Sequence, residues 1–133
     1  MQMSPYVSFK GDCAEAFRFY AQHLGGKIGG LFKYGGSPMA AQAPPGWDDK
    51  IMHGDITIGG TELMGADIAP EQYEAPKGVS LSLNMADQTE ADRMFAALAD
   101  GGRVIMPIGE TFWAKRFGVV VDRFGVQWLI NCE

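Results

Sequence analysis

The chain has 133 residues, of which 47% are hydrophobic and 20% charged, a composition typical of a single soluble globular domain. Acidic side chains outnumber basic ones by 16 to 11 and no basic stripe is present, so we expect no nucleic-acid partner. No segment approaches the roughly 18 apolar residues of a membrane helix, and the first residues show no export signal. We therefore expect a cytoplasmic protein that does not bind membranes.

The first half of the chain opens with a short strand, predicted over residues 5–10, and a helix, predicted over 13–24. Asp12 and Glu15 match the capping-box pattern, which marks the start of a helix. The apolar residues that follow fall on one face at helical spacing, and two consecutive glycines end the helix. The residues of this face are Ala16, Phe17, Tyr20 and Leu24.

Three more strands complete the first half, one near 27–34 and two, joined by a Gly-Gly turn, within 53–67. The segment 35–49 between them holds three prolines and no repeated apolar spacing. Loops of this length are uncommon in compact domains and often cover a binding site. We therefore predict a lid here, with Trp47 as its apolar anchor, and the alternative is a flexible insertion without a role in binding.

The second half of the chain repeats this plan. Asp87 and Glu90 form a second capping-box pattern, and two glycines again follow the helix. A strand, a turn and a strand close this half as they close the first. The elements are expected at 79–85, 88–100, 103–108 and 113–131.

Each half thus predicts one β-α-β-β-β module, and the two together predict an α+β fold. We expect one domain over 1–133, built from modules 1–70 and 77–133. Their curved mixed sheets should enclose a central cavity, with one helix per module on the outside.

Four segments carry a resemblance to a known family. They are SPYVSFKGDCAEAFRFY, KIMHGDITIGGTELMGAD, GETFWAKRFG and DRFGVQWLIN. In them the chain resembles the PhnB-like branch, also labelled 3-demethylubiquinone methyltransferase-like, of the vicinal-oxygen-chelate superfamily. That superfamily comprises glyoxalases, bleomycin-resistance proteins and extradiol dioxygenases. The resemblance implies a cavity for a small molecule and a homodimer, for which we expect contacts through Met1–Val7 and 103–121.

The resemblance also implies where a metal ion would bind, because metal-dependent members take one ligand from each of four strands. Those positions are here Pro5, Met64, Ser80 and Leu129. Proline and leucine offer no side-chain donor, and thioether and hydroxyl groups bind hard divalent ions weakly. We therefore expect no metal cofactor, and the leading hypothesis is a metal-free protein that binds a small molecule.

Two alternatives stay open. His53 and Asp55 alternate along one predicted strand and so share a face. Glu62 on the paired strand could complete a set of one histidine and two carboxylates that holds a divalent metal. Such a protein would be a lyase, an isomerase or a dioxygenase. The other alternative is a structural or regulatory dimer whose pocket is unused.

Strand alternation assigns side chains to the helix side or the cavity side of each sheet. The cavity side of the first module should carry Pro5, Val7, Phe9, His53, Asp55 and Thr57. The cavity side of the second module should carry Ser80, Ser82, Asn84, Gln127, Leu129 and Asn131. The helix side of the second module should carry Val79, Leu81, Leu83, Trp128 and Ile130. The mixture of hydrogen-bonding and aromatic groups on the cavity side suits a small organic ligand with polar ends.

The segment GETFWAKR (109–116) brings together an acid, an aromatic ring and a cation. Arg116 can hold a carboxylate or phosphate in a bidentate fork, and Trp113 can cover an apolar group. We predict an anionic ligand on Arg116, which would pair with Glu110 when the site is empty. The alternative is an aromatic strand edge with a purely structural ion pair.

Overall fold

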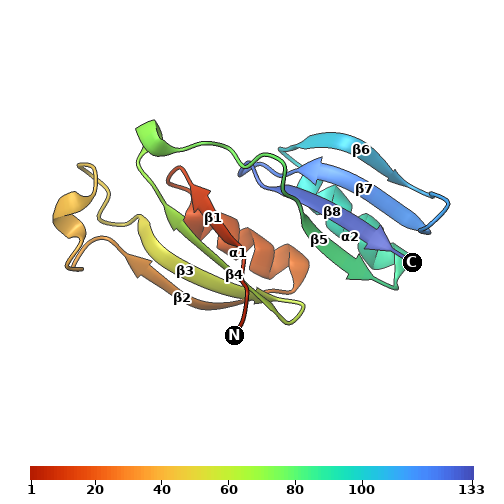
Figure 1. Ribbon diagram of the computed structural model, residues 1–133, viewed down its shortest axis with the longest axis horizontal. Coiled ribbons are helices and arrows are strands. Elements are labelled where there is room, and N and C mark those ends of the chain that lie inside the picture. The colour runs from red at the N-terminus through yellow and green to blue at the C-terminus, as the bar shows by residue number, and fades with distance from the viewer. The chain divides into compact units, whose positions relative to one another are not determined.

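The computed structural model describes residues 1–133, which divide into two compact units, Met1–Glu74 and Ala75–Glu133 (Figure 1). Each unit holds one α-helix and one four-stranded mixed sheet, so the predicted α+β fold of two β-α-β-β-β modules is confirmed. Both sheets are open, and neither closes into a barrel. No helix has the length and apolar character needed to cross a bilayer.

Unit 1 contains β1 (Tyr6–Phe9), α1 (Cys13–Leu24), β2 (Lys27–Lys33), η1 (Ala40–Gln42), β3 (Ile51–Ile58), β4 (Thr61–Asp67) and η2 (Pro70–Gln72), where η marks a single turn of 3-10 helix. Its strands lie in the order β1-β4-β3-β2. β1 and β4 run parallel, and the other neighbours run antiparallel. Parallel neighbours need a long connection, and α1 lies within the one that joins β1 to β4.

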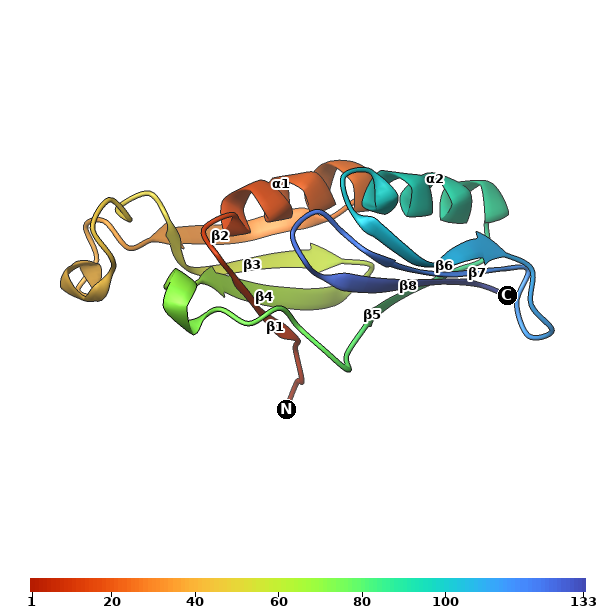
Figure 2. The ribbon, with the colours of Figure 1, turned by 90° about the horizontal axis from the view of Figure 1, so that it is seen from above.

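α1 covers one face of the unit 1 sheet (Figure 2). Its predicted apolar stripe is buried, and the Phe17 ring meets the Phe9 ring edge to face at 5.9 Å between centroids. Gly65 on β4 allows this approach, because a Cβ there would lie 3.0 Å from the Phe9 ring and 3.1 Å from the Phe17 ring.

The predicted position of Val7 and Phe9 on the cavity side is wrong. Both side chains are buried on the side of α1, whereas Tyr6 and Ser8 take the opposite face. Alternation determines which residues share a face, but not which face meets the helix. Burial of Val7 and Phe9 removes more apolar area from water than burial of a tyrosine and a serine would, and this difference decides the side.

α1 begins where the sequence predicts, but Asp12 does not cap it, because the Asp12 side chain accepts no hydrogen bond from the helix. Instead, Oδ1 of Asp67, at the end of β4, accepts from the backbone N–H groups of Gly11 and Cys13, each at 3.0 Å. Its Oδ2 accepts from the N–H of Ile51 at 2.8 Å. One buried carboxylate therefore joins β4, the start of α1 and the start of β3.

Unit 2 contains β5 (Leu81–Met85), α2 (Gln88–Ala99), β6 (Arg103–Gly109), β7 (Arg116–Val121) and β8 (Gln127–Cys132). The strand order β5-β8-β7-β6 and the parallel pair β5 and β8 match the plan of unit 1. Here the local cap forms as predicted, since the Asp87 side chain accepts from the N–H groups of Thr89 and Glu90.

β5 begins later than predicted. The strand starts at Leu81, and Val79, which was predicted to cover the helix, is 65% exposed. Pairing with β8 begins only at Leu81, opposite Trp128. The chain reaches this point through Gly78, whose φ of 74° belongs to a turn and not to a strand. Val79 therefore lies before the strand, directly after the bend at Gly78.

β7 begins at Arg116, inside the predicted segment 113–131 and not at its first residue. Thr111 forms a turn ahead of the strand. Its hydroxyl accepts from the N–H groups of Trp113 at 3.3 Å and Ala114 at 3.0 Å, and its own N–H donates to the Ala114 carbonyl at 3.0 Å. A hydroxyl that bonds the nearby backbone in this way competes with strand pairing.

Candidate functional site

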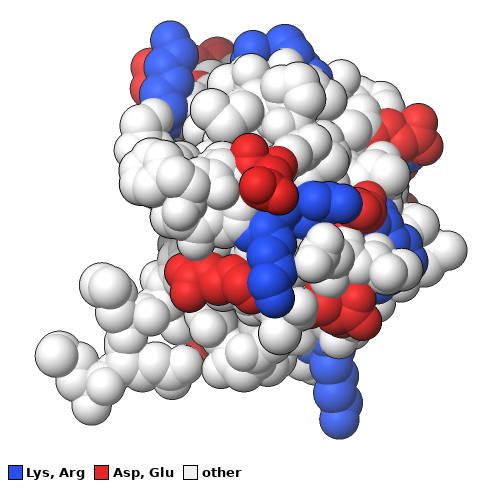
Figure 3. Space-filling view, turned by 90° about the vertical axis from the view of Figure 1, so that its right-hand side faces the viewer, with Lys and Arg blue, Asp and Glu red and all other residues white.

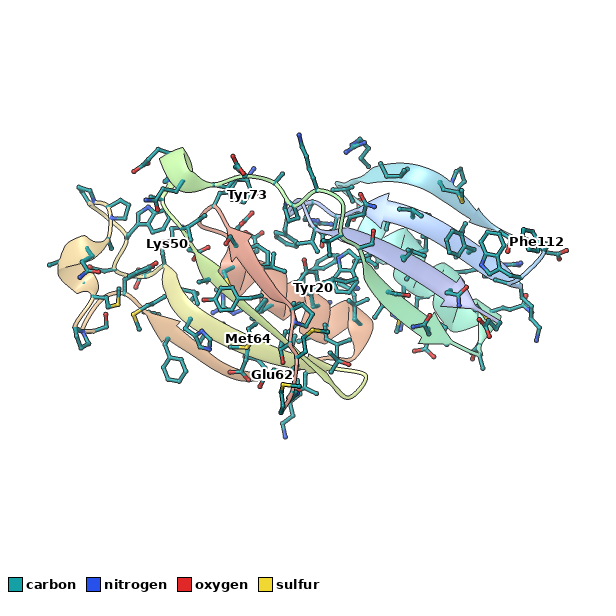
Figure 4. The ribbon with its side chains drawn as sticks, viewed as in Figure 1. Tyr20, Lys50, Glu62, Met64, Tyr73 and Phe112 are labelled. Atoms are coloured by element: carbon teal, nitrogen blue, oxygen red, sulfur yellow. The ribbon has the colours of Figure 1, made fainter.

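One face of the unit 1 sheet carries no helix of its own unit, and we call it the open face (Figure 2). The strand pairing places on it Tyr6 and Ser8 of β1, Lys27 and Phe32 of β2, His53, Asp55 and Thr57 of β3, and Glu62 and Met64 of β4. Glu62 and Met64 follow one another along β4 in Figure 4. His53 and Asp55 thus lie on the side of the sheet that the sequence predicts for them.

Side chains on the open face meet across the strands. The Tyr6 and His53 rings lie 5.9 Å apart, between centroids. Burial raises the pKa of the Tyr6 phenol above its ordinary value, and electrostatic interactions with Cys13 and Tyr34 raise this pKa further. The phenol therefore stays protonated at neutral pH and keeps a hydroxyl that can donate to a ligand.

Three polar side chains on the open face have no partner. His53, Asp55 and Glu62 are half-buried, yet none of them forms a hydrogen bond or an ion pair. A polar group that loses part of its hydration without a new hydrogen bond is in an unfavourable environment. These side chains are therefore available to a ligand.

The same three side chains do not form a metal site. No three His, Cys, Asp or Glu side chains of this chain lie close enough together to hold a metal ion. The alternative built on His53, Asp55 and Glu62 as joint metal ligands is therefore not supported by their arrangement.

The positions at which the resemblance implies metal ligands do not fit a divalent ion either. In unit 1, Pro5 has no side-chain donor and Met64 has a soft thioether. In unit 2, Leu129 has no donor, and the Ser80 hydroxyl already accepts a hydrogen bond from Nε2 of Gln127 at 2.7 Å. This set lacks both the charge and the imidazole groups that such ions require.

The predicted polar residues of unit 2 largely satisfy one another. Besides the Ser80–Gln127 bond, the Ser82 hydroxyl donates to Oδ1 of Asn84 at 3.2 Å, and Nδ2 of Asn131 donates to the same oxygen at 3.4 Å. Oδ1 of Asn131 is buried without a partner. Asn84 and Asn131 line a hollow of about 170 Å³ at the ends of β5 and β8, together with Met85 and Glu133.

The predicted ion pair between Arg116 and Glu110 is wrong. Nε of Arg116 donates to Oδ1 of Asp92 on α2 at 3.0 Å, and Nη1 donates to the Lys115 carbonyl at 3.0 Å. Arg116 pairs across the strands with the buried Cys132, so its side chain lies on the helix side of the sheet, and Glu110 is exposed. The guanidinium is thus paired away from the predicted cavity side, which removes the basis for an anionic ligand at this residue.

Trp113 belongs to a group of aromatic rings and not to a cluster with Arg116. Its ring meets Phe112 at 4.8 Å and Phe117 at 5.0 Å, in both cases edge to face. Phe112, in the middle of the β6–β7 connection (Figure 4), is 97% exposed. The acid, the ring and the cation of GETFWAKR therefore do not converge on one point.

The loop 35–49 extends beyond the end of the β2–β3 hairpin and does not lie over the open face (Figures 1 and 2). Its start is fastened, since the Tyr34 hydroxyl donates to the Asp67 carbonyl at 2.8 Å and the Tyr34 ring lies 6.2 Å from that of Trp47. The Tyr34 N–H also donates to the Lys50 carbonyl at 3.0 Å. Trp47 thus anchors the loop to its own hairpin, and closure of the loop over a ligand stays a prediction.

No motif in the sequence points to the aromatic residues Tyr6 and Phe32 of the open face. They become candidates through the strand register, in which Tyr6 pairs with Met64 and Phe32 pairs with His53. One signal for Phe32 is present in the sequence, because two glycines inside a predicted strand indicate a bulge. A bulge changes the face on which the following residues lie.

Charged side chains are mixed on the side of the molecule that Figure 3 shows. Lys and Arg lie among Asp and Glu there, and no broad basic surface is visible on that side. This mixture agrees with the net charge of −5.

The two modules have the fold of the glyoxalase and bleomycin-resistance superfamily. A structure described as a glyoxalase/bleomycin resistance protein/dioxygenase family enzyme, from Burkholderia phytofirmans PsJN, matches 96% of this chain and 95% of its own, with a TM-score of 0.63 and 17% identity. At this identity the likeness concerns the fold alone.

The chain belongs to the 3-demethylubiquinone-9 3-methyltransferase family, whose model matches residues 1–131. Protein YjdN of Escherichia coli K12 is 37% identical over 139 residues, which cover 98% of this chain and 95% of YjdN. Protein PA1353 from Pseudomonas aeruginosa has a similar structure, with a TM-score of 0.90 and 49% identity over 100% of this chain and 98% of its own. The PhnB protein from Bacillus cereus matches over the full length of both chains, with a TM-score of 0.85 and 25% identity. The predicted PhnB-like membership is confirmed.

Proposed function

We propose that this protein binds a small organic molecule on the open face of unit 1 without a metal ion. The observation that carries the proposal is the set of half-buried polar side chains there that have no partner: His53, Asp55 and Glu62. His53 lies beside the rings of Tyr6 and Phe32, and Asp55 is close to the Phe32 ring. A surface that combines unpaired polar groups with aromatic rings suits an organic ligand with a polar end.

The open face of unit 1 is a better candidate than the polar groups of unit 2. Ser80 and Gln127 are bonded to each other, and Ser82 is bonded to Asn84, so a ligand would have to replace existing hydrogen bonds. On the open face a ligand would supply bonds that are missing. Hydrogen bonds to unpaired, half-buried groups favour binding more than an exchange of one partner for another.

Metal-dependent chemistry and methyl transfer are not part of the proposal. The positions Pro5, Met64, Ser80 and Leu129 hold poor ligands for a divalent ion. The chain also has no glycine-rich GxGxxG loop between a strand and a helix to hold a nucleotide-type methyl donor.

A thermal-shift screen of small metabolites, on protein stripped of metal with a chelator, tests the proposal. We expect at least one compound to raise Tm, by the same amount with and without added Zn, Mn or Ni. Tyr6→Ala should weaken its binding roughly three- to tenfold, because a ring contact is lost. The matched change Phe112→Ala removes an exposed ring of unit 2 and should leave binding unchanged. A hit that needs the metal, or that Tyr6→Ala binds as tightly as the parent, would contradict the proposal.

We further propose that the protein is a cytoplasmic homodimer. The support for a dimer is a row of apolar side chains on β6, Val104, Ile105 and Met106, each between 44% and 46% exposed. Exposed apolar side chains on an edge strand favour association with another chain.

A further inference from the structure

β2 contains a bulge at its two glycines. Its pairing with β3 shifts between Ile28 and Gly30, so Gly29 is the extra residue. A Cβ on Gly29 would overlap the Asp55 carboxylate, and a Cβ on Gly30 would lie 3.6 Å from Oδ1 of Asp55. The bulge therefore leaves a space that the carboxylate occupies, and a residue with a side chain at position 29 would displace it.

An aromatic ring borders the same space. A Cβ on Gly30 would lie 3.0 Å from Cε2 of Phe32, so ring and carboxylate flank one point on the open face. Phe32 is 57% exposed and pairs across the strands with His53, which in turn contacts Tyr6. The Asp55 carboxylate therefore lies beside rings that a ligand can reach.

The Asp55 carboxylate has no cation of its own, because it forms no ion pair. Lys27, the one Lys or Arg among the strand residues of the open face, lies opposite Thr57. Glu62 lies opposite Thr57 from the other side and is also unpaired. A half-buried carboxylate without a counter-charge is stabilised by any cation that can reach it.

We propose that the ligand of this protein carries a protonated amine, which the Asp55 carboxylate binds while the ligand's carbon skeleton lies against Phe32 and Tyr6. The inference rests on the proposed function and gives its site a class of ligand. A charged donor makes the stronger hydrogen bond to a carboxylate, and aromatic rings attract organic cations. Gly29 is a positioning residue, since it sets where the carboxylate lies.

Three probes of one shape and different charge test the inference: benzylamine, benzyl alcohol and benzoate. Isothermal titration calorimetry on the full chain should show benzylamine binding at least about tenfold more tightly than either of the others, as expected for a charge-assisted hydrogen bond. Added salt should weaken this preference.

Two variants and a control connect the preference to Asp55. Asp55→Asn should lose about tenfold or more in benzylamine affinity and leave benzyl alcohol unchanged. Gly29→Ala should cause a similar loss while Asp55 is still present, and circular dichroism checks that it folds. Glu15→Gln removes an exposed carboxylate of α1, on the other side of the same sheet, and should change nothing.

The outcomes separate this inference from the proposed function. Four outcomes would each overturn the proposal of an amine ligand: equal binding of the three probes, tighter binding of benzoate, no binding of benzylamine, or full benzylamine affinity in Asp55→Asn. Each of them would still allow a neutral or anionic organic ligand on the open face. If neither these probes nor any metabolite of the screen binds to the open face, the proposed function itself fails.

Discussion

Asp67 is the side chain on which most of unit 1 depends. It is 1% exposed, and its carboxylate accepts three backbone hydrogen bonds, from Gly11, Cys13 and Ile51. It thereby supplies an acceptor to N–H groups at the start of α1, where a helix has no carbonyl acceptors of its own for them. A negative charge is also favourable at that end.

Asp67→Ala should therefore destabilise the protein by about 3 kcal/mol or more, because three buried N–H groups lose their acceptor. Asp67→Asn, which keeps one acceptor oxygen, should recover part of this loss. Urea denaturation measures both changes. The control is Asp100→Ala, which removes an exposed carboxylate paired with Arg123 and should cost no more than about 1 kcal/mol. Equal stabilities of Asp67→Ala and Asp100→Ala would show that the contacts of Asp67 carry little energy.

Unlike the Asp67 carboxylate, the Asp12 carboxylate has an oxygen, Oδ1, that is buried without a hydrogen bond. Burial raises the pKa of the Asp12 carboxyl above its ordinary value of 3.8, and the nearby Asp67 and Glu15 raise it further. The folded protein thus holds this proton more tightly than the unfolded chain does. The charge on Asp12 therefore costs stability, and the cost appears as the pH rises from below 3.8 through the raised pKa.

Asp12→Asn cannot ionise and should escape this cost. Its Tm should equal that of the parent at the acid end and exceed it at neutral pH, with the difference growing between. Thermal melts from acid to neutral pH give the measurement. A Tm difference that is constant with pH, or that shrinks as pH rises, would show that the surroundings do not disfavour the ionised form of Asp12.

Asp12 and Asp67 also show what local pattern can predict. The capping-box signature locates the start of α1 correctly, because the residue types and their spacing are those of a helix start. It does not reveal that the acceptor for the Cys13 N–H is a residue 54 positions away, Asp67 at the end of β4. In unit 2 the position is filled by a local cap from Asp87, so the same signature there describes the actual contact.

At the level of the elements, each helix needs a glycine in the sheet beneath it. A Cβ on Gly118 of β7 would lie 2.7 Å from Cε2 of Phe95 on α2 and 3.0 Å from the Cα of Ile108 on β6. The ring can move, but the backbone of β6 can move much less. The close approach of α2 to its sheet thus depends on this residue.

Gly118→Ala should therefore destabilise the protein by about 1–3 kcal/mol through overpacking. The matched control is Gly109→Ala on the neighbouring strand β6, where a Cβ would meet nothing within 4 Å. Chemical denaturation of both variants tests the prediction. A Gly118→Ala protein as stable as Gly109→Ala would mean that the sheet and helix adjust freely.

The elements themselves follow from the sequence, but the faces of the strands follow only in part. Period-two alternation correctly places His53 and Asp55 on the open face of the unit 1 sheet. It also correctly places Trp128 and Ile130 on the helix side of the unit 2 sheet. It assigns Val7 and Phe9 to the wrong side, because a four-residue strand with an apolar residue on each face does not tell which face is covered. Arg116 is misplaced for a related reason: its partner Asp92 lies on a helix that the local segment does not include.

For the molecule as a whole, the repeated capping-box patterns and glycine pairs predict two modules of the same β-α-β-β-β plan. The two units have matching strand orders, as this plan requires. The candidate site is less predictable. The sequence indicates Asp55 through its place on a strand. The position of its carboxylate next to Gly29 and the absence of an ion pair depend on a bulge and on strand register. Those are set by long-range pairing, which no short segment specifies.

The association of the chain is a property of the whole molecule that β6 makes testable. β6 is an edge strand, since β7 is its one neighbour in the sheet of unit 2, and Ile105 on it is 46% exposed. Light scattering at micromolar concentration should give twice the chain mass of 14.4 kDa. Ile105→Lys places a charge in the exposed apolar row and should shift the protein toward the monomer, because charged side chains block edge-to-edge association. The matched change Val79→Lys, at a side chain that is 65% exposed outside β6, should leave the dimer intact. A monomeric parent would contradict the homodimer, and a dimer that survives Ile105→Lys but not Val79→Lys would move the interface away from β6.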